Sequence, residues 1–240
     1  METSNPLLKR DNALSSAWAG AEPMSLQGVI NKTGILLLLC MGTAGYGWTH
    51  PELRGPLMLV GILGGLVACL VGTFKPTTAP FAAPIYALLE GLALGCISQA
   101  IERSYPGIVL NAMLLTFGVL GLMLVLYTTR TIVVTDKLMK GVLVATGAVM
   151  LVYLADMVMH MLGVRVPFIH ESGPVGIILS LVVVGIAAFN LLVDFAVIED
   201  GVRRGSPRYM EWYCGMALLV TLVWLYLEIL RLLAKMRGRD

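Results

Sequence analysis

The chain has 240 residues, of which 58% are hydrophobic and only 13% are charged, and its mean hydropathy is +0.83. Soluble globular domains carry about 25% charged residues, so this composition excludes an ordinary soluble domain and indicates an integral membrane protein. The net charge of +2 is too small to indicate nucleic-acid binding, and we expect no nucleic-acid partner.

The first 32 residues differ from the rest of the chain. They are polar, carry charges of both signs and lack the apolar stretch of a signal peptide. We expect residues 1–32 to be a cytoplasmic N-terminal tail and residues 33–236 to form the membrane domain.

Seven apolar runs follow the tail, each close to the 20 or so residues that a spanning helix needs. In chain order they cover residues 33–48, 56–74, 83–101, 107–127, 138–162, 175–198 and 210–233. Pro84 and Pro174 stand at the starts of the third and sixth runs, where a helix tolerates proline. The sequence therefore predicts an all-α integral membrane protein with seven transmembrane helices.

Glycines recur in the first three runs, and small residues let helix backbones approach closely in lipid. We expect packing faces at Gly42, Gly45 and Gly47, at Gly61, Gly64, Gly65 and Gly72, and at Gly91 and Gly95.

The lysines and arginines of the short loops favour a cytoplasmic N-terminus. In that orientation ten of them lie inside and three lie outside. The basic C-terminal tail, which holds Arg231, Lys235, Arg237 and Arg239, would then lie outside. Either the last helix violates the positive-inside rule or one span is re-entrant.

Four acidic residues lie well within the runs: Glu90, Asp156, Asp194 and Glu228. An ionised carboxylate at the bilayer centre costs about 2.5–3.5 kcal/mol on insertion scales, so these groups must face the bundle interior or water, or be neutral. Each one taken alone is explained equally well as a hydrogen bond between helices. Four in one chain favour a polar pathway for ions or protons.

The neighbours of these acids predict specific contacts. Asn190 precedes Asp194 by one helical turn and shares its face, while Arg231 follows Glu228 by three residues, the spacing of an ion pair. Asp156 and His160 are four residues apart on one face. We interpret them as a hydrogen-bonded pair at a helix end, because two ligands do not make a metal site.

No sequence feature indicates an enzyme. The chain has no HExxH, no Walker loop, no GxSxG elbow and no Rossmann glycine pattern. The four cysteines fall in separate runs without a CxxC pair, so we expect core residues and no covalently bound cofactor.

Two stretches are similar to the Bax inhibitor-1 family, also called the transmembrane Bax inhibitor motif family. "PIYALLEGLALGCISQAIERSYPGIVLNAMLLTFGVLGLML" resembles its third and fourth helices, and "NLLVDFAVIEDGVRRGSPRYMEWYCGMALLVTLVWLYLEILRLLAKMRG" resembles its last two. The likeness covers roughly residues 30–236 and is greatest to the bacterial branch.

The resemblance implies six helices around a central seventh, in a bacterial cytoplasmic membrane, and a pH-sensitive leak with calcium as the permeant ion. It also implies that two acids on the last two helices sense pH by sharing a proton. Asp194 matches the first of these acids, and Glu228 takes the place of the second, where relatives carry an aspartate. The resemblance extends more weakly to Glu90, near the region that lines the family's pore.

Three functions compete at this point. The first is a pH-gated calcium leak channel built on these carboxylates. The second is a non-transporting partner that regulates a membrane protease or another membrane protein, with the acids as interhelical contacts. The third is a proton-coupled transporter, which ranks last because the sequence has no paired halves with matching broken helices.

Overall fold

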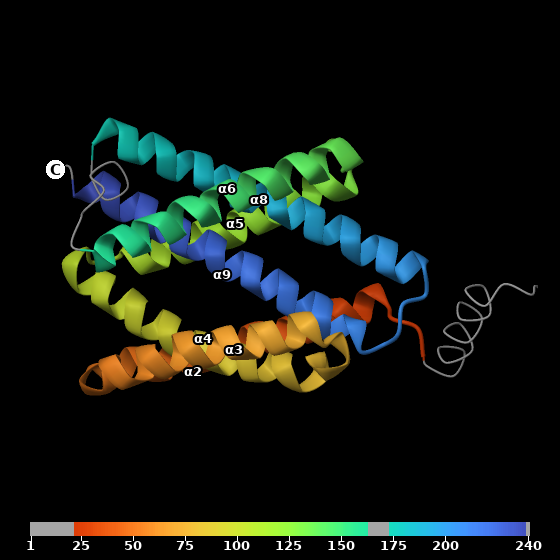
Figure 1. Cartoon of the computed structure of the whole chain (residues 1–240), viewed down its shortest axis with the longest axis horizontal. Helices are drawn as coiled ribbons and strands as arrows, with labels where there is room; N and C mark the ends of the chain where they lie inside the picture. The colour runs from red at the N-terminus through yellow and green to blue at the C-terminus, as the bar shows by residue number, and fades with distance from the viewer. Residues whose placement is uncertain (1–21, 163–172, 239–240) are drawn as a thin grey trace, which may run out of the picture.

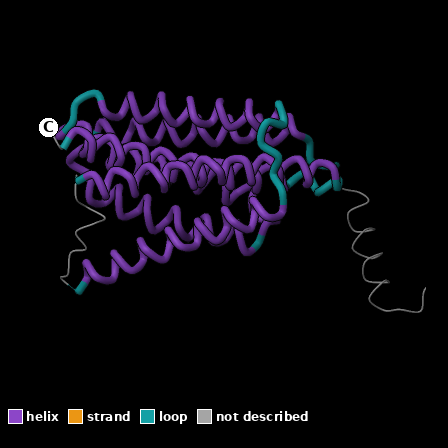
Figure 2. Tube along the Cα trace, turned by 90° about the horizontal axis from the view of Figure 1, so that it is seen from above, coloured by secondary structure: helices purple, strands orange, loops and turns teal. Residues whose placement is uncertain are grey.

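A computed structural model describes residues 22–162 and 173–238. Within this part the helices are α2 (Leu26–Thr49), α3 (Arg54–Phe74), α4 (Ala79–Ser104), α5 (Ile108–Thr128), α6 (Asp136–Met161), α8 (Pro174–Arg203) and α9 (Met210–Arg237). Two short 3₁₀ turns, η1 (Pro51–Leu53) and η2 (Pro76–Thr78), precede α3 and α4. Figure 2 shows that the remaining described residues are short loops.

The seven predicted spans are confirmed. All seven helices are long and apolar enough to cross a membrane. Even α5, with 21 residues, is about 31 Å long at 1.5 Å per residue, which matches the hydrocarbon thickness of about 30 Å. The start of α2 and the end of α9 lie at opposite ends of the bundle (Figure 1), as seven full spans require.

Two helices begin four or more residues earlier than predicted. α2 begins at Leu26, seven residues before the first apolar run, because the side chain of Ser25 caps it by accepting a 3.0 Å hydrogen bond from the backbone N–H of Gly28. α4 begins at Ala79, so the prediction that Pro84 opens the third helix is wrong. Pro84 lies inside α4, and Pro80 takes the first turn, where no N–H partner is needed. Pro174 does open α8.

The last helix is central, as the resemblance implies. Figure 1 shows α9 between two groups of three helices. The first group, α2–α3–α4, packs on itself and on α9. The second group is α5, α6 and α8, of which α5 and α8 pack directly on α9.

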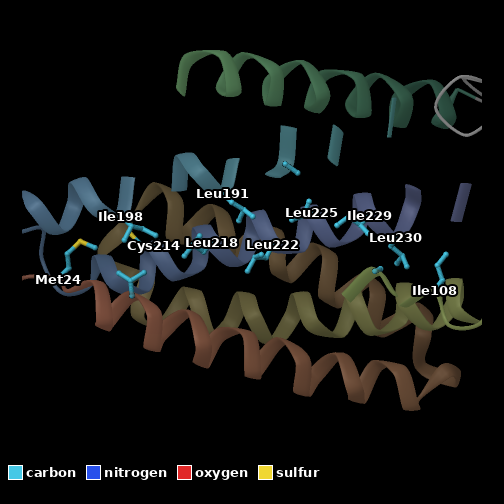
Figure 3. Packing of buried hydrophobic residues seen from close by; sticks show 13 residues of the cluster. Met24, Ile108, Leu191, Ile198, Cys214, Leu218, Leu222, Leu225, Ile229 and Leu230 are labelled. Carbon is cyan, nitrogen blue, oxygen red and sulfur yellow. The ribbon is translucent and has the colours of Figure 1, made fainter. Parts of the chain in front are cut away.

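Two apolar stripes on α9 form the core. Cys214, Leu218, Leu222, Leu225 and Ile229 recur every three or four residues and belong to one buried cluster. Figure 3 shows them beside Leu191 and Ile198 of α8. A second stripe, with Met216, Leu219 and Val223, packs against α2, α3 and α4. Because a 3.6-residue period places the two stripes on different faces, α9 joins both groups.

Glycines set the close packing of the first group. A methyl group on Gly47, Gly61, Gly91 or Gly95 would meet a backbone carbonyl of the facing helix, and one on Gly64, Gly65 or Gly72 would meet a side chain. The expected packing faces are thus confirmed at these positions. Gly42 and Gly45 differ, because no other helix among the described residues comes within 4 Å of the Cβ position of either.

The residues before α2 pack on the loop between α8 and α9. The backbone N–H of Met24 donates to Ser206 (2.7 Å), and Pro23 forms an isolated β-bridge with Pro207. Met24 is only 3% exposed. Residues 22–25 of the expected tail therefore belong to the folded bundle.

Candidate functional site

Asp194 lies within α8, well before the end of the helix at Arg203, and its side chain faces α9. Its Oδ2 accepts a 2.7 Å hydrogen bond from the hydroxyl of Thr221, which also donates to the carbonyl of Ala217 on its own helix. The carboxylate is half-buried and has no ion pair with any described residue. An acid inside a span is thus joined to the central helix by one neutral donor.

Asn190 forms no hydrogen bond with Asp194 in the described part of the chain, although it lies one turn away on the same helix. Its amide donates to Thr146 Oγ1 on α6 (2.8 Å) and to the carbonyl of Ile186 (2.9 Å). Asn190 therefore links α8 to α6.

Glu228 is the most thoroughly paired of the predicted acids and is only 1% exposed. Arg231 lies 3.1 Å away, so the predicted ion pair is present. The phenol of Tyr153 on α6 donates to the same carboxylate at 2.8 Å, and the indole of Trp224 at 3.3 Å. Arg231 also donates to the Tyr153 oxygen (2.6 Å). The cluster joins α6 to α9.

The structure does not bring Asp194 and Glu228 together. Thr221, which holds Asp194, precedes Glu228 by seven residues, or about 10 Å along α9. The hydrogen bonds of the two acids lead to separate partners, and the described part of the chain has none between them. A shared proton would require a different arrangement of α8 and α9.

Glu90 lies half-buried on α4, in the first helix group. A methyl group on Gly65 of α3 would lie 3.0 Å from its carboxylate, so the acid sits against that helix. Among the described residues it has neither a hydrogen-bond partner nor an ion pair. α9 runs between its helix group and that of Asp194 (Figure 1), so the two acids belong to separate environments.

The secondary candidates on α6 lie near its C-terminal end, where Asp156 is half-buried and His160 is exposed. Within residues 22–162 and 173–238, no three His, Cys, Asp or Glu side chains form a group that could hold a metal ion.

Sequence analysis missed two buried charges. Glu211, in the first turn of α9, is 3% exposed and accepts hydrogen bonds from the N–H of Ser25 (2.8 Å), the hydroxyl of Ser25 (3.1 Å) and the ammonium of Lys32. Lys235, in the last turn of α9, is 7% exposed and donates to Ser180 Oγ (2.8 Å) and to the carbonyl of Gly176 (3.2 Å). Each lies near an end of the last apolar run, where charges at a membrane surface also occur.

One protein family matches nearly the whole chain. Neither curated proteins nor solved structures give a match. The family described as Bax inhibitor 1 like matches residues 5–238, a range that includes all seven helices and every acid discussed above. Because the match covers nearly the whole chain, the chain belongs to the Bax inhibitor 1 like family.

Proposed function

We propose that this protein is a pH-sensitive cation leak channel, with calcium as the permeant ion, and that it is not an enzyme. The observation that carries the proposal is the carboxylate of Asp194, which lies inside a spanning helix, accepts a hydrogen bond from a single hydroxyl on α9 and has no counter-ion among the described residues. A buried charge without a partner is unfavourable, so ionisation of Asp194 disfavours the packing of α8 on α9 seen here.

Protonation can therefore act as the switch. The neutral acid keeps the hydrogen bond to Thr221 without a buried charge, and the bundle stays closed. The ionised acid favours water or a cation beside it, and carboxylate and hydroxyl oxygens are ligands that suit calcium. Separation of α8 from α9 would expose both groups to such an ion.

The proposal gives Glu228 a different role from the one that the resemblance implies. Arg231 already neutralises its charge, and Tyr153 and Trp224 occupy the same carboxylate. We assign Glu228 to the attachment of α6 to α9, and pH sensing to Asp194 alone.

The location is a bacterial cytoplasmic membrane with the N-terminus inside. The loops support this orientation, because the α5–α6 and α8–α9 loops lie at the end of the bundle where α2 begins (Figure 1), and these loops carry Arg130, Arg204 and Arg208. The basic residues after Glu228 lie at the opposite end, and the burial of Lys235 removes one of them from the loop charge that sets orientation. Labelling of single cysteines placed at residues 132 and 206 should occur from the cytoplasmic side only.

The decisive experiment is calcium flux into proteoliposomes, measured at several pH values across the physiological range. Asp194→Asn keeps the shape of the side chain but cannot ionise, so its flux should no longer depend on pH. Glu228→Gln should keep a pH-dependent flux, since Glu228 lies in a separate cluster. An unchanged pH response of Asp194→Asn would reduce Asp194 to a structural contact.

Asp200→Asn is the matched control. Asp200 lies on the same helix, but its partners are Arg203 and Arg204 at the helix end, at 2.7 Å each. This variant removes the same charge and should keep the pH response of the wild type. A loss of the response in both variants would mean that the net charge of α8 matters and that the position of Asp194 does not.

A partner protein without transport activity is the alternative, in which the N-terminal tail binds a membrane protease. The deletion that tests it must end at residue 21, because Met24 and Ser25 already pack on the loop before α9 and on Glu211. Loss of partner regulation with normal folding and no calcium flux in the full-length protein would favour this alternative.

A further inference from the structure

A cavity of about 310 Å³ lies between α6, α8 and α9, apart from Asp194. Its walls are mostly apolar, with Val149 and Val152 from α6 and Leu179 and Val183 from α8. The volume is at the lower end of the range of small-molecule sites, about 300–1,000 Å³.

One end of this cavity is cationic. Of the residues that line it, only Arg231 and Lys235 are charged, and Tyr153 and Ser180 supply hydroxyl groups beside them. Arg231 is paired with Glu228, which does not line the cavity. The three charges together leave a net charge of +1.

Lys235 has no counter-ion among the described residues, although only 7% of its surface is exposed. An ammonium group has three N–H donors. Two of them reach neutral acceptors, Ser180 Oγ and the carbonyl of Gly176, which leaves one donor for a ligand. Buried charges in proteins are paired, so the site is incomplete without an anion.

We propose that this cavity binds an anionic phospholipid, with the phosphodiester at Lys235 and Arg231 and part of an acyl chain between α6 and α8. The single negative charge of a phosphodiester balances the net charge of the site. The apolar walls have no donor or acceptor to offer, which suits a hydrocarbon chain.

The depth of the site favours a lipid over a free anion. Ser180 is the seventh residue of α8, about 9 Å from the start of that helix, and Lys235 lies in the last turn of α9. The cationic end is thus near the membrane face where headgroups lie, while the apolar end reaches toward the bilayer interior. The inference does not rest on ion conduction.

The test is thermal unfolding of the purified full chain in a neutral detergent, titrated with phosphatidylglycerol. We expect a saturable rise of the melting temperature of the wild type. Phosphatidylcholine with the same acyl chains, or inorganic phosphate, should produce little rise. In Lys235→Met, which keeps the length of the side chain, the affinity for phosphatidylglycerol should fall about tenfold or more, because a charge-assisted hydrogen bond is lost.

Two further variants separate the headgroup from the chain. Lys140→Met removes an exposed lysine on α6 and should leave the affinity unchanged. Ala148→Phe fills the apolar part of the cavity and should weaken phosphatidylglycerol binding with all charges in place. Equal stabilisation of the wild type by phosphatidylcholine, or equal affinity in Lys235→Met, would overturn the proposal. Stabilisation by inorganic phosphate alone would also overturn it and would indicate a free-anion site.

Discussion

The two helix groups on either side of α9 are held together in different ways. In the first group, α2–α3–α4, glycines bring backbones into contact, as at Gly95, where a methyl group would overlap the carbonyl oxygen of Ala44. In the second group, five glycines inside α5, α6 and α8 have no atom of another described element within 4 Å of their Cβ positions: Gly118, Gly121, Gly141, Gly147 and Gly185. Glycines thus accompany close packing in the first group, while most glycines of the second group lie on open faces.

Polar contacts replace close packing in the second group. α6 is held by the Asn190–Thr146 hydrogen bond and by the link from Tyr153 to Glu228, and Val142 is its one buried residue. Lipid supplies no hydrophobic force between helices, so association depends on such packing or hydrogen bonds. Because moving elements come from the less stable parts of a protein, the group that carries Asp194 is the one expected to move.

We expect the largest loss of stability from a substitution that disrupts the close packing of the first group. Gly95→Ala places a methyl group against the backbone of α2, which cannot move aside as a side chain can. We expect a loss of about 3 kcal/mol or more of unfolding free energy, at the upper end for overpacked sites. Unfolding by sodium dodecyl sulfate in mixed micelles measures it, and a loss below about 1 kcal/mol would contradict the contact.

A smaller effect should follow when the polar contacts of α6 are removed. Asn190→Leu and Tyr153→Phe should each cost about 0.6 kcal/mol and at most about 1.7 kcal/mol, the range measured for hydrogen bonds within membranes. Their partners, Thr146 and Glu228, lie on different helices, so the losses should add.

Amide hydrogen exchange would show in which helices that stability is lost. In the double variant, amides of α6 should exchange faster while those of α4 keep the protection of the wild type. Equal acceleration in both helices would mean that the two groups do not differ in how they are held.

The fold could be predicted to a large extent because its signals are local. Apolar run length identifies the spans, and the Glu228–Arg231 pair lies within one helical turn. The small residues Gly91 and Gly95 follow from spacing along α4. Which face of a helix packs against another helix cannot be predicted from nearby residues alone. The expected packing at Gly42 and Gly45 is therefore wrong.

The site was less predictable because its partners are distant in sequence. Glu211 accepts a hydrogen bond from Lys32, 179 residues away, and Lys235 donates one to Ser180, 55 residues away. A charge near the end of an apolar run resembles an interfacial residue until the facing helix is known. The one related sequence signal is the basic C-terminal tail, which includes Lys235 and conflicts with the positive-inside rule unless one span is re-entrant.

The smallest predicted effect tests the open faces of the second group. Gly147 lies exposed in the middle of α6 with no neighbouring atom at its Cβ position, so Gly147→Ala meets no obstacle. Alanine loses less backbone entropy than glycine when a helix forms, which favours the variant by about 0.5–1 kcal/mol. The same substitution at Gly95 should act in the opposite direction, and both are measured by the same unfolding assay. If Gly147→Ala destabilises the protein by as much as Gly95→Ala, then α6 has a close-packed neighbour at this position, and the difference between the two helix groups does not hold.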